Sequence, residues 1–233
     1  MRGLLPGLAF DQSQIFYAYA GIRPLPASDG TAAGLISRDH SAPVLEAAQD
    51  RPFPVIALVG GKWTTFRGFA EKVANSVLAR LSHPRQVSTQ NLPIGGGKGY
   101  PGDLAARAKW IIATAQATGT RPDRVEQMLA RYGTTARQVL AHPGDEARLP
   151  DAQTYSRGEI DWIIAHEQAV HLADIVMRRT TLAITGGLSM ADLQAIADVA
   201  AMRLGWSVDQ MRQEIAATLT VLEDRHRIRL AAA

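Results

Sequence analysis

From Asp103 onward, capping residues and helix breakers divide the chain into short amphipathic segments that favour helix. Asp103 is placed to cap one segment, and Pro122 opens another that stops at Gly133, with proline in the first turn and glycine past the end. Capping-box spacings begin at Ser156, Ser189 and Ser207. Because no fixed period relates these segments, we do not expect a solenoid. The sequence predicts a small all-helical domain over 103–233.

Strand signals are confined to the chain before this domain. Ile15–Tyr19 is β-branched and aromatic, and it predicts a short strand; Leu35–Arg38 predicts a second. Pro54–Val59 is a continuous apolar run between proline and two glycines, which indicates a strand buried on both faces. Apolar residues at helical spacing over 66–81 predict a helix directly after it, with Thr64 or Thr65 as its N-cap.

Composition supports one ordinary globular chain with two unlike parts. The 233 residues are 46% hydrophobic and 20% charged, which excludes a disordered or fibrous chain. Residues 82–102 are rich in proline and glycine and form the predicted linker. We therefore predict an α+β, mainly α fold: an incomplete α/β part over 1–81, the linker over 82–102, and the all-α domain over 103–233.

Several function classes are excluded by residue usage. The chain has no cysteine, so thiol catalysis and zinc-thiolate sites are ruled out. A net charge of +3 without any run of five like charges gives no support for a nucleic-acid-binding arm. No apolar stretch approaches the roughly 20 residues of a membrane span. We expect a cytoplasmic protein, with peripheral membrane contact as the alternative, because the basic residues Arg178–Arg179 and Arg225–Arg229 suit either helix ends or anionic lipid.

Two motifs are rejected on their spacing. Residues 97–102 match G-x-G-x-x-G, but Pro101 interrupts the motif and no strand precedes it, so we interpret the segment as linker. His166 and His171 are five residues apart, about 140° around a helix, whereas a zinc-binding helix places its histidines four apart. We predict no metal site.

The segment Gly60–Thr65 is the most informative local feature. It follows the predicted strand and opens the predicted helix, so backbone N–H groups, two glycines and the Lys62 ammonium suit an anion or a polar cofactor. The alternative is a plain tight turn with Lys62 in solvent.

Arg23 and Arg38 flank a Pro/Gly-rich loop. If the two side chains converge, they suit a phosphate or a carboxylate; if they do not, each is an ordinary arginine on a solvent-exposed surface.

Taken together, six segments resemble the C-terminal part of the FAD-dependent, quinone-linked glycerol-3-phosphate dehydrogenases. We call them the family segments. They occur in family order over residues 15 to 225: Tyr19–Leu25, Ile36–His40, Gly60–Arg67, Leu92–Gly96, Arg131–Gly133, and His166–Ala169 with Asp174 and Met177–Thr180.

The resemblance implies roles for individual residues. It places the turn Gly60, Gly61, Lys62, Trp63 and Thr64 at the isoalloxazine and ribityl end of FAD. It places Arg23, Arg38 and Lys62 around the substrate, with Arg23 as the catalytic residue. It also implies that 1–81 is the C-terminal end of an FAD- and substrate-binding domain and that 103–233 is a helical cap domain.

One departure from the family shapes the expected function. The family carries a G-x-G-x-x-G nucleotide fingerprint near its amino terminus, and nothing before Tyr19 matches it. We therefore expect that this chain alone does not bind FAD and that it is a fragment, a truncated gene product or one half of a split enzyme. A separate chain with the N-terminal FAD domain is then the expected partner.

The expected activity is oxidation of sn-glycerol 3-phosphate to dihydroxyacetone phosphate with electrons passed to quinone. We expect the chain to be inactive without the N-terminal FAD-binding part. The alternative is a non-catalytic helical module that binds a partner protein, or a relic fragment. A neighbouring reading frame that encodes the FAD domain favours the enzyme, and its absence favours the alternative.

Overall fold

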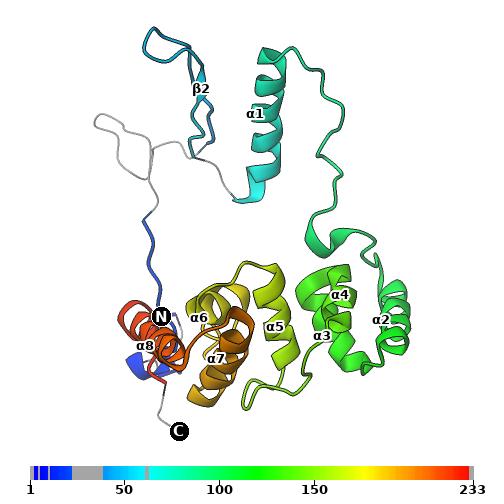
Figure 1. Ribbon diagram of the computed structural model, residues 1–233, viewed down its shortest axis with the longest axis vertical. Coiled ribbons are helices and arrows are strands. Elements are labelled where there is room, and N and C mark those ends of the chain that lie inside the picture. Colours follow the sequence, from blue (N-terminus) through cyan, green and yellow to red (C-terminus); the bar gives the residue numbers. More distant parts are fainter. Residues whose placement is uncertain (1–2, 5, 10, 23–38, 61–62, 231–233) are drawn as a thin grey trace. The chain divides into compact units, whose positions relative to one another are not determined.

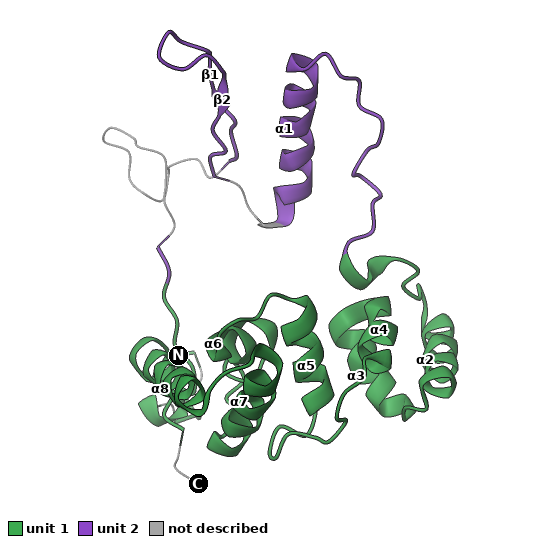
Figure 2. Ribbon diagram, viewed as in Figure 1, with its two compact units in different colours: residues 1–20, 95–233 green, residues 21–94 purple. Residues whose placement is uncertain are grey.

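The computed structural model describes residues 3–4, 6–9, 11–22, 39–60 and 63–230 (Figure 1). The chain divides into two compact units, coloured green and purple in Figure 2. We call residues 1–20 with 95–233 the helical unit, and residues 21–94 the hairpin unit. Helices dominate the described residues, and their sheet has two strands, which confirms the predicted mainly helical class. The boundaries predicted at 81 and 102 remain predictions.

The hairpin unit contains one small sheet and one helix. Strand β1 (Val44–Leu45) pairs antiparallel with β2 (Val55–Ile56), with Val44 opposite Ile56, and a bridge from Ser41 to Val59 extends the pairing. A 3₁₀ turn, Trp63–Thr65, leads into α1 (Phe66–Arg80), which confirms the predicted helix. None of the described residues of this unit is buried.

Two of the predicted strands differ from the structure. Pro54–Val59 forms only the short β2, and Val55 and Leu58 are exposed, because no second layer of described residues covers the hairpin. Ile15–Tyr19 is not a strand; it belongs to the helical unit, where Tyr17 stacks on His226 and the Ala18 N–H donates to the His226 carbonyl at 3.0 Å. Leu35–Arg38 lies outside the described residues.

In the helical unit, α2 packs on α3, α3 on α4 and α7 on α8, which are neighbours in sequence, and α5 packs on α7 across the intervening α6. A π-helical turn, Ile175–Arg179, continues directly from α6. The helices are α2 (Leu104–Thr118), α3 (Pro122–Tyr132), α4 (Ala136–Ala141), α5 (Arg157–His166), α6 (Leu172–Asp174), α7 (Met190–Leu204) and α8 (Val208–His226). Short 3₁₀ turns lie at Gln12–Gln14, Gly95–Gly97 and Gly133–Thr135.

In the helical unit, several helix ends follow the capping residues that the sequence indicates, whereas Thr65 occupies the N-cap position of α1 without a side-chain capping bond. The Asp103 side chain accepts from the Ala106 N–H, and Ser189 and Ser207 form complete capping boxes. Gly205 ends α7 in the left-handed conformation, which costs glycine nothing. Ser156 caps α5 through the Glu159 N–H, but the Glu159 carboxylate turns inward instead of closing the box.

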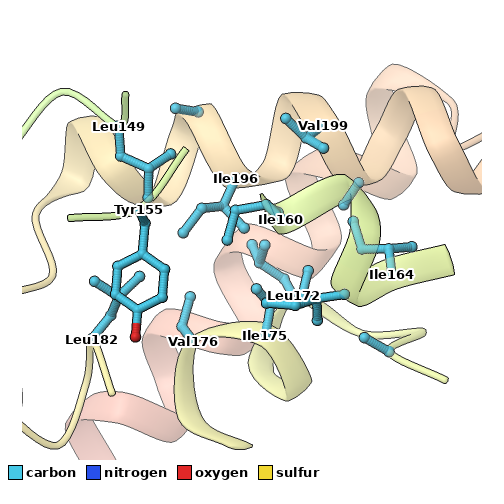
Figure 3. Packing of buried hydrophobic residues seen from close by; sticks show 14 of the residues in the cluster. Leu149, Tyr155, Ile160, Ile164, Leu172, Ile175, Val176, Leu182, Ile196 and Val199 are labelled. Atoms are coloured by element: carbon cyan, nitrogen blue, oxygen red, sulfur yellow. The ribbon is translucent and has the colours of Figure 1, made fainter. Parts of the chain in front are cut away.

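One continuous apolar core holds the helical unit together. Figure 3 shows it between α5, α6, the π-helical turn and α7, with Ile160 facing Ile196 and with Leu172 beside Ile175. A smaller cluster joins α2 to α3 through Ile111, Ala115, Val125 and Leu129. Among the helices that the structure describes, none combines the length and apolar character needed to cross a membrane.

We expect amide hydrogen exchange to separate the two units. Backbone amides of α5 and α7 should exchange slowest, because they lie in the buried core, whereas those of β1, β2 and α1 should exchange much faster, because none of their described side chains is buried. Exchange of the intact chain followed by mass spectrometry measures this. Equally slow exchange over Val44–Ile56 and over α7 would contradict the assignment of stability to the helical unit.

A second prediction concerns the contact between α6 and α8. Glu214 on α8 accepts from His171 Nδ1 at 2.8 Å and from the Leu172 N–H at 2.9 Å. The hydrogen bond that His171 donates to Glu214 raises the pKa of His171 above its ordinary 6.5, since it favours the imidazolium. The resulting stabilisation is present below the unfolded-state pKa and is lost as pH rises through the folded-state pKa.

An NMR titration of the His171 ring protons checks this. Glu214→Gln should return the pKa of His171 toward 6.5, and Glu223→Gln, whose parent pairs with Arg229, is the control that should leave it unchanged. An unchanged His171 titration in Glu214→Gln would overturn the assignment.

Candidate functional site

The predicted cofactor turn begins at Gly60, whose backbone requires glycine. Its φ is +71°, and an added Cβ would lie 3.0 Å from the Asp39 carbonyl oxygen. Trp63–Thr65 then forms the 3₁₀ turn before α1, with Thr64 exposed. Gly61 and Lys62 lie outside the described residues. Position 60 therefore favours glycine on both conformational and steric grounds.

The predicted substrate arginines also lie outside the described part of the chain. Arg23 and Arg38 both fall in the undescribed range 23–38, and Lys62 falls in 61–62. The convergence of Arg23, Arg38 and Lys62 on one phosphate stays a prediction.

In the helical unit, two family segments meet through a close backbone contact. A Cβ on Gly96 would lie 1.8 Å from the Tyr132 carbonyl oxygen, and one on Gly133 would lie 2.4 Å from the Gly96 carbonyl oxygen. The Thr134 hydroxyl donates to the carbonyl oxygens of Gly96 at 3.0 Å and Lys98 at 2.7 Å. Only glycine at both positions permits this approach, so the segment ending at Gly96 is held against the C-terminal end of α3.

Beside this contact lies a buried carboxylate that two arginines share. The Glu159 side chain is fully buried, and that of Arg124 is 2% exposed. Glu159 accepts from Arg124 Nη2 at 2.8 Å, from Arg131 Nη1 at 2.9 Å and from the Tyr132 hydroxyl at 2.8 Å. These bonds satisfy the carboxylate without water, which is the condition for a buried charge.

The Tyr132 phenol acts as a permanent donor in this cluster. Burial raises the pKa of Tyr132 far above its ordinary value, and the negative charge of Glu159 raises it further. The phenol therefore stays protonated and donates to Glu159. Tyr132 and Trp162 also pack edge to face, with ring centroids 5.4 Å apart.

Two adjoining cavities share Arg131, Tyr132 and Glu167 in their walls. One, of about 520 Å³, lies beside Gly95–Gly97, Tyr100 and Trp162. The other, of about 460 Å³, reaches Arg178–Thr181. Three family segments thus contribute residues to these walls: Leu92–Gly96, Arg131–Gly133, and His166–Ala169 with Met177–Thr180. They come together although Gly95 and Thr180 are 85 positions apart in the sequence.

The two histidines of the rejected metal motif have other partners. His166 stacks on Trp162 with centroids 4.9 Å apart, and its Nδ1 lies 3.0 Å from the Trp162 carbonyl oxygen. His171 pairs with Glu214. Within the described residues, no group of three or more histidine, cysteine or acidic side chains is arranged to hold a metal ion.

Sequence reasoning missed Glu159 and Arg124. The sequence indicated Glu159 only as the acid of a capping box that begins at Ser156, and Arg124 is a charged residue on the buried face of α3, next to Val125 and Met128. The available signal was the apolar stretch after Glu159, which places its helix in the core. That pattern does not indicate which cation meets the carboxylate.

Comparison with known proteins gives consistent matches. Residues 87–211 match the family described as the C-terminal domain of alpha-glycerophosphate oxidase. The chain is 30% identical to a probable mitochondrial glycerol-3-phosphate dehydrogenase of Dictyostelium discoideum, covering 90% of this chain and 33% of that protein. It is 30% identical to a glycerol-3-phosphate dehydrogenase of Synechocystis, covering 91% and 38%. A glycerol-3-phosphate dehydrogenase of Mycobacterium leprae is 30% identical, covering 85% and 33%.

The chain thus spans a little over a third, at most, of the length of these relatives. The matched range contains α2 to α7 and the whole cluster around Glu159. The geometry that unites Gly96, Arg131 and Glu167 belongs to this matched region.

We predict that Glu159 is required for the stability of the helical unit. Glu159→Gln leaves Arg124 buried without a counter-charge, and we expect it to cost about 3–5 kcal/mol of unfolding free energy. Glu223→Gln, at an exposed pair with Arg229, should cost less than about 1 kcal/mol. Urea unfolding followed by circular dichroism measures both. An equal loss of unfolding free energy in the two variants would contradict the prediction that the buried cluster stabilises the helical unit.

Proposed function

Because the chain belongs to the family of the alpha-glycerophosphate oxidase C-terminal domain, we propose that it forms part of a flavin-dependent glycerol-3-phosphate dehydrogenase. The reaction is oxidation of sn-glycerol 3-phosphate to dihydroxyacetone phosphate, with quinone as the electron acceptor. The observation that carries the proposal is the match over residues 87–211, most of which lies in the helical unit, where residues from three of the family segments line two adjoining cavities. The proposed cofactor and substrate roles rest on the three family segments before residue 87, through their resemblance to the glycerol-3-phosphate dehydrogenases.

The turn at Gly60 fits the flavin end of FAD. Gly60 has a left-handed backbone with no room for a side chain beside the Asp39 carbonyl, and it lies shortly before α1 in the sequence. The residues that would hold the cofactor are Gly60, Gly61, Lys62, Trp63 and Thr64. Bound FAD supplies the hydride acceptor, and the protein contributes binding and orientation.

The substrate end of the proposed site consists of cations from the hairpin unit. Glycerol 3-phosphate carries a dianionic phosphate, which suits the guanidinium of Arg38 with Lys62 beside it. Arg23 is proposed to lie nearest the reacting carbon, where it stabilises charge that develops at the C2 oxygen.

A separate chain with an FAD domain is the proposed partner. The hairpin unit leaves Leu45, Phe53, Val55 and Leu58 exposed, and none of its described residues is buried. Apolar strands in this state favour association with further sheet. This feature also suits the second candidate function, a non-catalytic module that binds a partner protein.

The decisive experiment combines this chain with an FAD-binding chain from the same genome. The complex should retain flavin absorbance through gel filtration and reduce quinone when glycerol 3-phosphate is added. A complex that holds flavin but shows no such activity would reject the dehydrogenase and leave the interaction module.

Substitution of the two arginines tests their roles in that complex. Arg38→Ala should raise KM roughly ten- to a hundredfold with kcat retained, because loss of a charge-assisted hydrogen bond costs about 1.5–3 kcal/mol. Arg23→Ala should lower kcat as well, since its contact strengthens in the transition state. Lysine at either position should rescue poorly, because it lacks the bidentate fork.

Arg225→Ala is the matched control, an exposed arginine at the end of α8 in the helical unit. It should leave both kinetic constants unchanged. If Arg23→Ala and Arg38→Ala also match the parent, these two residues do not bind the substrate.

A further inference from the structure

The second cavity beside Glu159 has the chemistry of an oxyanion site, distinct from the residues proposed for glycerol 3-phosphate. We call it the arginine pocket: a cavity of about 460 Å³ whose walls include Arg131, Arg178, Arg179, Thr180, Thr181 and Glu167. We propose that the arginine pocket binds a phosphate group. All of its residues belong to the helical unit, whereas Arg23, Arg38 and Lys62 belong to the hairpin unit.

Arg131 is held in place before any ligand arrives. Its Nη1 donates to both oxygens of Glu159 and to the Thr154 carbonyl, and its guanidinium carbon lies 3.7 Å from the centroid of the Tyr155 ring. Its Nε and Nη2 have no hydrogen-bond partner among the described residues. A guanidinium fixed on one edge and free on the other loses little entropy when it binds an anion.

An excess positive charge lies behind Arg131. Glu159 is a single carboxylate shared between Arg124 and Arg131, so among the ion pairs of the described residues one of these two guanidinium charges has no carboxylate of its own. An anion in the pocket would offset this charge at short range.

The other two arginines come from the π-helical turn Ile175–Arg179. Such turns are rare and occur frequently at functional sites. Arg178 Nη1 donates to Asp174 at 2.8 Å, and Arg179 donates from Nε and Nη2 to the Glu167 carbonyl. In the described part of the chain, Arg178 Nε and Nη2 and Arg179 Nη1 have no further hydrogen-bond partner.

The acidic group in the pocket wall does not reverse its charge. The Glu167 carboxylate lies 3.5 Å from Arg179 Nε, so these two charges compensate each other. Asp174 and Arg178 form a second neutral pair. The charge that remains at the pocket is the surplus from the Arg124, Arg131 and Glu159 cluster.

Phosphate is the anion that these donors fit. Guanidinium forks bind phosphate oxygens in pairs, and the Thr181 hydroxyl, whose partner is the Tyr155 hydroxyl, adds a neutral donor at the same wall. The volume lies within the range of small-molecule sites and admits a phosphate with an attached group. That group belongs either to a soluble phosphate ester or to the headgroup of an anionic phospholipid.

Thermal unfolding of the full chain in inorganic phosphate, against chloride at equal ionic strength, tests the proposal. We expect a saturable rise of the midpoint in phosphate alone. Arg178→Gln should weaken the apparent affinity at least about fivefold, since it removes a charged donor worth about 1 kcal/mol or more. Arg131→Gln should abolish the effect.

Arg212→Gln is the matched control. Both arginines are exposed and form an ion pair within one helical turn: Arg178 is 61% exposed and pairs with Asp174, and Arg212 is 73% exposed and pairs with Asp209. Arg212 is not among the residues that line the pocket. Arg212→Gln should keep the phosphate response of the parent. Equal midpoints in phosphate and chloride, or equal responses of Arg178→Gln and Arg212→Gln, would overturn the proposal.

A third variant separates this site from the proposed substrate site. The triple variant Arg23→Ala, Arg38→Ala and Lys62→Ala should keep the full phosphate response, whatever its effect on dehydrogenase activity. Loss of the response in this variant would assign the phosphate to the hairpin unit and reject the arginine pocket.

Sedimentation with vesicles distinguishes the two sources of phosphate. Binding to phosphatidic acid vesicles that Arg178→Gln weakens, with no binding to phosphatidylcholine alone, would identify a lipid headgroup. A positive phosphate titration without vesicle binding would identify a soluble ester.

Discussion

The buried Glu159 carboxylate is the interaction on which the arrangement of the helical unit depends. A fully buried charge must have partners, and Glu159 on α5 finds them in Arg124, Arg131 and Tyr132, all on α3. This requirement fixes how α3 lies against α5. The end of α3 then stands where Gly133 contacts Gly96, and Arg131 reaches both cavities.

The two units differ in what holds them together. In the helical unit, a continuous apolar core spans α3 to α8, and polar bonds such as Glu159 with Arg131 specify its register. The hairpin unit has a two-stranded sheet and one helix, without a buried residue among those described. We therefore expect independent stability in the helical unit, and the proposed function assigns to the hairpin unit a partner that completes its sheet.

Residues from three of the family segments have structural roles within the helical unit. Gly96 and Gly133 are required by a backbone contact, Arg131 by the buried carboxylate, and Arg179 by the Glu167 carbonyl. Residues that mark the family in sequence thus perform structural work within this unit. The same work leaves free guanidinium edges around one cavity, which is why a structural cluster can also be a binding site.

Local patterns in the sequence determined the helices and their ends. The caps at Asp103, Ser189 and Ser207 were predictable, because each cap bond spans only three residues. Tertiary structure decided the rest. Ile15–Tyr19 has the composition of a strand, but its backbone bonds to His226 instead of to another strand. The Glu159 carboxylate binds Arg124 and Arg131 instead of completing the capping box. These outcomes depend on contacts between residues 28 to more than 200 positions apart, and a buried charge takes whichever partner the fold brings to it.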